Sequence, residues 1–258
     1  MFQLKYPIFQ KGRILKIAML EALRDTPLSF IQTSFVGYNS GILQGFELLI
    51  ENERIVVQPG ILKVGKYILV LDEALAIPYF ATDRLMFLNI TVPENQESTD
   101  ISLKEAAIEL TSQEANRESS WELMRFKLKK GAYLRKEYQS FEDLVTEYNT
   151  VNTVYQCVAR HKEYALSPTM IQLFCHYVQE LNSQHPLDQS FCLQALQNNG
   201  VIGEKALMYY IQQRLKETTE KTTAEVVHHQ LNRILLDIKR NRNQEVNQQR
   251  KNRKLIVD

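Results

Sequence analysis

Glycine and lysine residues between positions 60 and 66 have the spacing of a phosphate-binding loop. The segment Gly60-Ile-Leu-Lys-Val-Gly65-Lys66 matches all but the last position of G-x-x-x-x-G-K-[ST], the pattern of the nucleotide-binding P-loop. The last position is Tyr67, and its phenol cannot replace the small hydroxyl that binds Mg²⁺. The residues after it, 67–71, are aliphatic and predict a strand, whereas the loop requires a helix N-terminus there. A nucleotide-dependent enzyme is therefore disfavoured, and no cofactor is expected.

Cysteine and histidine residues gather in one stretch and could serve as metal ligands or as a nucleophile with its base. Zinc prefers thiolate and imidazole ligands, but the spacings here fit no zinc-finger or ribbon pattern. A catalytic cysteine needs a base and an orienting group, and neither Cys157 with His161 nor Cys192 with His185 has a third group nearby in the sequence. We therefore expect structural burial rather than a metal site or a catalytic site. The stretch contains Cys157, His161, Cys175, His176, His185 and Cys192.

Basic residues dominate the end of the chain. Such a run neutralises phosphates of nucleic acid, binds an acidic protein surface, or forms a solvated extension of the last helix. No aromatic residues alternate with the cations, so base stacking is not supported. The candidate contact residues for a partner or nucleic acid are Lys239, Arg240, Arg242, Arg250, Lys251, Arg253 and Lys254.

The segment 41–67 also predicts two short strands around a Pro-Gly turn. Apolar and β-branched runs at 46–50, 55–57 and 61–64 alternate with polar or glycine-containing turns. Further extended runs at 67–71, 85–92 and 121–128 follow, and 101–112 is compatible with either a strand or a helix. This spacing predicts a small antiparallel sandwich or barrel. Its structural turn residues are Gly41, Gly45, Pro59, Gly60 and Gly65.

Helical periodicity flanks the β region on both sides. Apolar residues in 11–25 form a stripe that we expect to end at Pro27. From Ser167 onward the apolar residues recur with the helical period of 3.6, and Ser167 is an N-cap followed by Pro168 at the first helical position. This region predicts four helices, and a capping-box pattern at Thr222 marks the start of the fourth. The predicted fold class is α+β, with a helix and a small β sandwich or barrel followed by a bundle of about four helices.

Length and composition limit the possible classes. A chain of 258 residues is long enough for two modest domains. Its net charge of +1 produces no overall electrostatic attraction to nucleic acid or membrane. We expect 1–135 to be a helix plus β domain, 136–166 a linker with a short helix, 167–240 a helical domain and 241–258 a basic tail. No apolar run approaches 18 residues, so no membrane span is expected. The three cysteines cannot all pair within one chain and form no C-x-x-C motif, and the N-terminus does not have the pattern of a signal peptide. Both features favour the cytoplasm.

Two family resemblances apply to the first half of the chain. The residues 38–45, 55–61 and 65–67 form a pattern of a Gly-flanked turn, a V-x-PG turn and a Gly-aromatic strand start. This pattern resembles the N-terminal region of phage tail and baseplate proteins over about 60 residues. The stretch 9–25 also resembles a group of uncharacterised Gram-positive proteins that sometimes carry a helicase label, which the incomplete phosphate loop does not support. Neither resemblance defines catalytic residues.

The most concrete hypothesis is a non-enzymatic assembly protein, a component of a phage-tail-like or contractile-injection baseplate whose partners are other protein subunits. The first alternative is an accessory protein that binds nucleic acid through residues 239–254, which predicts retention on DNA or RNA that falls with salt. The second, disfavoured alternative is a cryptic nucleotide-dependent enzyme, for which Lys66→Ala would abolish turnover.

Overall fold

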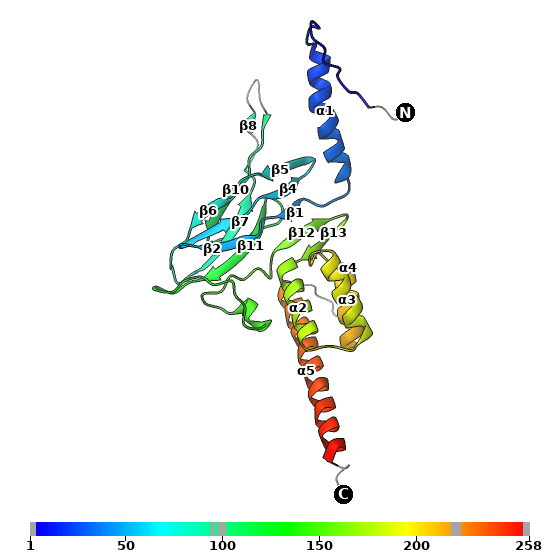
Figure 1. The fold of residues 1–258 in the computed structure, drawn as a ribbon. Helices are drawn as coiled ribbons and strands as arrows, with labels where there is room; N and C mark the ends of the chain where they lie inside the picture. The colour runs from blue at the N-terminus through cyan, green and yellow to red at the C-terminus, as the bar shows by residue number, and fades with distance from the viewer. Residues whose placement is uncertain (1–3, 94–95, 98–101, 218–222, 255–258) are drawn as a thin grey trace.

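A computed structural model describes residues 4–93, 96–97, 102–217 and 223–254; the side chains of 96–97, 102–103 and 245–254 lie outside the description. A β module occupies the middle of the molecule, a helix projects from it at the N-terminal end, and a helical bundle lies at the C-terminal end (Figure 1). The predicted α+β class is confirmed.

The helices of the described chain flank this β module. One precedes the strands, a short 3-10 helix lies before the last two strands, and four helices follow the last strand. They are α1 (Ile17–Ser34), η1 (Glu142–Val145), α2 (Pro168–Glu180), α3 (Pro186–Gln197), α4 (Glu204–Leu215) and α5 (Ala224–Lys254).

The strands form separate small sheets. The largest has the order β13-β12-β1-β4-β5, and two three-stranded sheets have the orders β10-β7-β11 and β2-β3-β6. Strands β8 and β9 pair with each other. The strand bounds are β1 (Gly41–Gly45), β2 (Leu48–Glu51), β3 (Arg54–Val57), β4 (Gly60–Val64), β5 (Tyr67–Leu71), β6 (Leu75–Pro78), β7 (Leu85–Thr91), β8 (Gln96–Glu97), β9 (Ser102–Leu103), β10 (Ala107–Thr111), β11 (Ser120–Lys127), β12 (Cys157–Arg160) and β13 (Glu163–Leu166).

One apolar core holds the three larger sheets together. Ile42, Ile55, Leu88 and Leu123 come from β1, β3, β7 and β11, and each is at most 1% exposed. Burial of a side chain of this size stabilises a fold by about 1.5–3 kcal/mol. Among the described strands the sheets do not close into a barrel, because β5 and β10 both remain outer strands.

The strand interpretation of 41–67 is confirmed. Residues 60–64 and 67–71 form the antiparallel pair β4–β5, joined by a turn at Gly65 (φ +57°), so no helix follows Lys66. Gly45 has φ +80°, and a Cβ there would overlap the Pro59 carbonyl. A Cβ on Gly60 would come within 2.6 Å of the Phe46 ring. These glycines allow close backbone approach between strands, which is a structural role.

The four predicted C-terminal helices are present. Ser167 Oγ accepts a hydrogen bond from the Met170 amide at 3.2 Å, with Pro168 at the first helical position, as the sequence predicts. The predicted cap Thr222 lies outside the described residues. Thr223 Oγ1 instead accepts from the Val226 amide at 3.4 Å, at the start of α5. The ambiguous stretch 101–112 contains strands β9 and β10.

The N-terminal helix differs from its expected bounds. It runs from Ile17 to Ser34 and contains Pro27, which was expected to end it. Gly12 at φ +85° lies in a turn and Lys16 is extended, so residues before 17 leave the helical path. Proline removes only one backbone donor, and on an exposed helix the first carbonyl it leaves free can bond water. The helix therefore continues for two turns past Pro27.

Residues 136–166, expected as a linker, contain η1, β12 and β13. Phe141, Leu144 and Val154 from this stretch are buried in the same cluster as α2–α5. Strand β12 also pairs with β1 through Ile42 and Val158. The stretch thus contacts both parts of the molecule, and the division into domains stays a prediction.

Candidate protein-interaction surface

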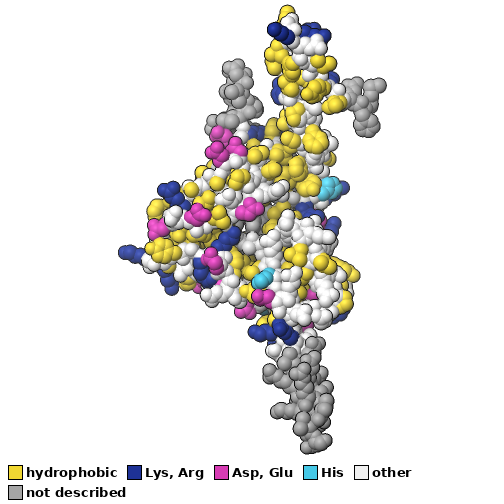
Figure 2. Space-filling model, in the orientation of Figure 1, with side chains coloured by type: hydrophobic (Ala, Val, Ile, Leu, Met, Phe, Trp, Pro, Cys, Tyr) yellow, Lys and Arg dark blue, Asp and Glu magenta, His cyan; other side chains and the backbone are white. Residues whose placement is uncertain are grey.

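Helix α1 has no buried residue along its 18 positions. Ile17 and Phe30 are 76% and 74% exposed, and Leu20, Leu23 and Leu28 are each about half exposed. Figure 2 shows apolar side chains over much of this projecting helix. In proteins most helical stability comes from packing an apolar face, so a helix with this much uncovered apolar surface points to a missing partner.

The apolar residues of α1 occupy one broad side of the helix. At 100° per residue, Leu20, Leu23, Pro27, Phe30 and Ile31 fall within about 100° of one another, with Ile17 and Leu28 at one margin. Glu21, Asp25, Ser29 and Gln32 fall on the opposite side. The large apolar side chains of α1 are between 39% and 76% exposed: Ile17, Leu20, Leu23, Leu28, Phe30 and Ile31.

The residues before α1 extend this surface. We call residues 4–16 the N-terminal arm. Its apolar side chains are more than half exposed: Leu4, Tyr6, Ile8, Phe9, Ile14 and Leu15. Residues 1–20 carry four cations and no carboxylate side chain. Thr26 Oγ1 donates to the Lys5 carbonyl at 3.3 Å, which places the start of the arm beside the middle of α1.

The other end of α1 is fixed to the β12–β13 hairpin. Gly37 has φ +80°, and a Cβ there would lie 2.5 Å from His161 Nε2. The Lys162 amide donates to the Gly37 carbonyl at 2.8 Å, and the Asn39 amide donates to the Arg160 carbonyl at 3.1 Å. Only glycine fits this contact without strain. We call residues 35–39 with His161 the α1 joint.

Aromatic rings complete the α1 joint. The Phe35 and Tyr38 rings meet edge to face at 5.4 Å, and Tyr38 and His161 meet at 6.2 Å. Asn39 Nδ2 also donates to the Glu163 carbonyl at 3.2 Å. Helix α1 is therefore held in a defined direction while its apolar side stays uncovered.

The cysteine and histidine candidates are dispersed by the fold. His161 belongs to the α1 joint, whereas Cys157 is buried, with its thiol near the Tyr155 carbonyl and its pKa raised by burial. His185 caps α3, because its Nδ1 accepts from the Leu187 amide at 3.2 Å. His176 is exposed beside Glu180. Among the described residues, no group of three or more His, Cys, Asp or Glu side chains could hold a metal ion.

Cys175 and Cys192 do come together between α2 and α3. Both are free and buried. The pKa of the Cys175 thiol is raised, mainly by a hydrogen bond with Cys192 and to a smaller extent by burial. Both side chains pack as small apolar groups in the helical core.

The basic residues of the C-terminal end lie on α5. The helix leaves the bundle after Ile238 and continues to Lys254 (Figure 1). Lys239, Arg240 and Arg242 are exposed, and Arg242 Nη1 donates to the Glu180 carbonyl at 3.0 Å. The side chains of Arg250, Lys251, Arg253 and Lys254 lie outside the description.

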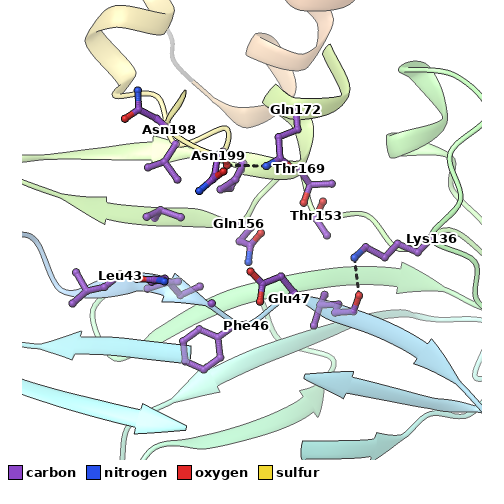
Figure 3. Close-up of a pocket in the computed structure, with 17 residues that line it drawn as sticks. Leu43, Phe46, Glu47, Lys136, Thr153, Gln156, Thr169, Gln172, Asn198 and Asn199 are labelled. Carbon is purple, nitrogen blue, oxygen red and sulfur yellow. Dashed lines mark hydrogen bonds between the residues drawn. The ribbon is translucent and has the colours of Figure 1, made fainter. Parts of the chain in front are cut away.

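A groove of about 580 Å³ separates the β module from α2 and the α3–α4 connection. Most polar side chains lining it are carboxamides or hydroxyls, including Gln156, Gln172 and Thr153 (Figure 3). Lys136 Nζ donates to the Leu48 carbonyl at 2.7 Å, and burial lowers the pKa of this amine. Gln172 bonds the Asn199 carbonyl. The groove therefore offers mainly hydrogen-bonding side chains.

Comparisons with known proteins give a limited result. No family model and no curated protein matches the chain. A chain in the type VI secretion system TssK-TssF-TssG baseplate subcomplex is similar with a TM-score of 0.37 and 10% identity, covering 90% of this chain and 99% of that one. The crystal structure of TssK is similar with a TM-score of 0.35 and 11% identity, covering 92% and 58%. These solved structures are baseplate components, but such low similarity carries no argument about function. Within the described residues, no helix is long and apolar enough to span a membrane.

Proposed function

We propose that this chain is a non-enzymatic structural subunit of a multi-protein assembly, and that α1 with the N-terminal arm is its docking surface. The observation that carries the proposal is the uncovered apolar side of α1, held in a fixed direction by the α1 joint. A flexible tail could collapse onto its own core, but a helix that is fixed at its base presents the surface outward. The more specific form, a phage-tail-like or contractile-injection baseplate component, follows the sequence resemblance of residues 38–67.

The energetics fit an interface anchor. Covering one large apolar side chain contributes about 1.5–3 kcal/mol, and interfaces depend on a few such central residues. Phe30 and Ile17 are the most exposed large side chains of α1. Replacing either one with Asp would weaken docking by roughly tenfold or more, because a carboxylate would be desolvated against an apolar partner.

The test uses tagged protein recovered from its own host, with mass measurement and electron microscopy of the purified particles. The intact chain is expected in large assemblies, and Phe30→Asp and Ile17→Asp are expected to be lost from them, with unchanged circular dichroism. Leu193→Asp is the matched control, since Leu193 is 65% exposed on α3 in the helical bundle. Recovery of the intact chain only as a monomer, or equal assembly of all variants, refutes the proposal.

The exposed cations on α5 support a second candidate, binding to nucleic acid. Lys239, Arg240 and Arg242 lie where the helix projects from the bundle. Retention on a DNA column should fall steeply with salt and be lost when these three become Gln, while Phe30→Asp leaves it unchanged. Retention that ignores salt, or survives the triple substitution, excludes this candidate.

A further inference from the structure

Two outer strands from different sheets line one cleft. Strand β5 is the outer strand of the five-stranded sheet, and β10 is the outer strand of the β10-β7-β11 sheet. A cleft of about 750 Å³ lies between them, and we call it the seam cleft. Outer strands have backbone donors and acceptors on their open side, to which another extended chain can bond.

The seam cleft is lined mainly by aliphatic side chains. Leu62 and Ile90 lie at its base and are 1% exposed, while Leu69, Leu71 and Ile108 are partly exposed. The cleft is therefore an open continuation of the β core. An added strand with apolar side chains on one face would extend the core and hydrogen-bond an open edge.

The N-terminal arm has the pattern of such a strand. Leu4, Tyr6 and Ile8 alternate with other residues and are 79%, 81% and 61% exposed. Six residues, 4–9, extend about 20 Å, and the five-residue strands β5 and β10 extend about 17 Å. Pro7 has no backbone N–H to donate, so one edge of the arm could form every backbone hydrogen bond with a neighbouring strand, whereas the other edge would lack the one from Pro7.

Charge also favours this match. The arm contains Lys5 among its first residues and no carboxylate side chain. Exposed carboxylates flank the cleft: Glu105 lines it, Glu109 lies on β10, and Asp72 directly follows β5. The cleft's own cation, Lys104, lies over the Tyr67 ring at 3.9 Å.

We propose that the N-terminal arm of one copy lies as an added strand in the seam cleft of a second copy. The donor is not the same copy's arm, because Thr26 Oγ1 in α1 donates to the Lys5 carbonyl. The N-terminal segment runs along the side of α1 that is turned away from β8 and β10 (Figure 1). The contact joins two different surfaces, so it is directional and generates a ring or a filament. The inference rests on the proposed function and names a second copy of this chain as one partner.

The test has two readouts on the intact protein. Sedimentation should show association that increases with concentration. A fluorescent peptide of residues 4–16 should bind the intact chain by anisotropy. Ala107→Phe, which fills the cleft, and Ile108→Asp, which places a charge in it, should each weaken peptide binding at least about tenfold. Tyr6→Asp in the peptide should have the same effect.

Leu193→Asp and Leu75→Asp serve as controls, because both residues are exposed and lie outside the seam cleft. Thermal melts identify any variant that fails to fold, and the Tyr6→Asp peptide needs no variant of the receiving protein. Binding that ignores both cleft variants overturns the inference, as does a strictly monomeric chain that leaves the peptide unbound. If that result occurs while Phe30→Asp still abolishes assembly in the host, the proposed function stands and only the second-copy contact is refuted.

Discussion

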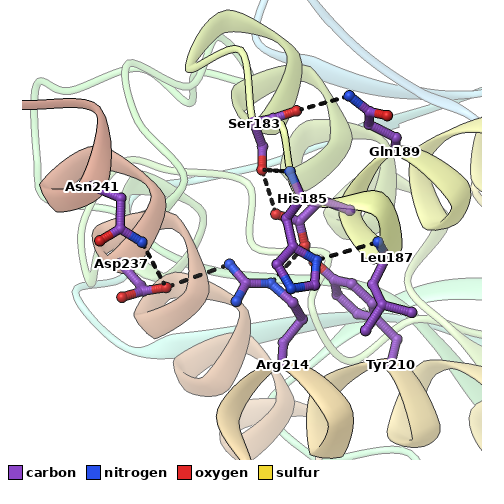
Figure 4. A network of polar contacts seen from close by, with 9 residues as sticks. Ser183, His185, Leu187, Gln189, Tyr210, Arg214, Asp237 and Asn241 are labelled. Atoms are coloured by element: carbon purple, nitrogen blue, oxygen red, sulfur yellow. Dashed lines mark hydrogen bonds and ion pairs between the residues drawn. The ribbon is translucent and has the colours of Figure 1, made fainter. Parts of the chain in front are cut away.

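Replacing Asp188 with Asn tests whether one buried carboxylate organises the helical bundle. Asp188 lies in the first turn of α3 and is fully buried. It accepts hydrogen bonds from Ser183 Oγ at 2.6 Å, Tyr210 Oη at 2.8 Å and Arg214 Nε at 2.7 Å. Arg214 also lies 3.4 Å from Asp237 on α5 (Figure 4). The carboxylate thus connects α3 to α4 directly and to α5 through Arg214.

The expected loss of unfolding free energy is about 3 kcal/mol. Asn has the same volume as Asp, but its side chain has only one acceptor oxygen for the three donors that surround Asp188. Each hydrogen bond to a charged group contributes about 1.5–3 kcal/mol. Removing one partner of a buried ion pair costs about 3–5 kcal/mol. Arg214 is only 9% exposed and would retain Asp237, which is half exposed, so the lower part of this range applies.

The assay is urea unfolding followed by two signals. Far-UV circular dichroism reports the helices, and fluorescence of the single tryptophan, Trp121, reports the β module. The dichroism transition should move to lower urea in Asp188→Asn. Asp237→Asn is the control and should cost less than about 1 kcal/mol. A loss below about 1 kcal/mol in Asp188→Asn would refute the reasoning.

Three further predictions concern the rest of the chain. The hydrogen bond with Arg135 is the main cause of the lowered pKa of Asp143, so the ionised carboxylate stabilises the fold fully above about pH 4 and this stabilisation is lost as the pH falls further. Asp143→Asn should therefore flatten the acid side of a plot of unfolding free energy against pH. An unchanged acid side would contradict this. Gly37→Ala should reduce the free energy of unfolding by about 1–3 kcal/mol and lower the melting temperature. It should also loosen the α1 joint, which would be measured as faster amide hydrogen exchange near His161. Calorimetry should show no ATP or GTP binding to the intact chain, and Lys66→Ala should change stability by less than about 0.5 kcal/mol; saturable binding that this variant removes would restore the P-loop interpretation.

Local signals in the sequence predict much of the fold. The Gly65-Lys66 turn, the β-branched runs and the Ser167 cap act over a few residues, and the corresponding strands and helices are present. Pro59 and Gly60 do not form a hairpin turn, because they connect β3 and β4, which belong to different sheets. Sheet order could not be predicted in this way, because β12 joins β1 across more than 100 residues. Such pairing depends on the whole core rather than on neighbouring residues.

The sequence did not predict the candidate surface, because its candidate contact residues lie on α5 and not on α1. The sequence shows an amphipathic pattern near residue 20, but the same pattern describes a helix that packs on its own core. What distinguishes α1 is the absence of any buried residue along its length, which only the three-dimensional arrangement shows. The signal that was available is the arm: apolar side chains and four cations before Glu21, with no carboxylate side chain.

Helices α1 and α5 leave the molecule at opposite ends (Figure 1). If each end is attached to a different neighbour, any pulling force between those neighbours must pass through the middle of this chain. The β12–β13 hairpin lies on that path, because it carries the α1 joint on one side and leads into α2 through Ser167 on the other. The mechanical strength of the subunit would then be set by this short hairpin and its four residue pairs, rather than by the larger cores on either side.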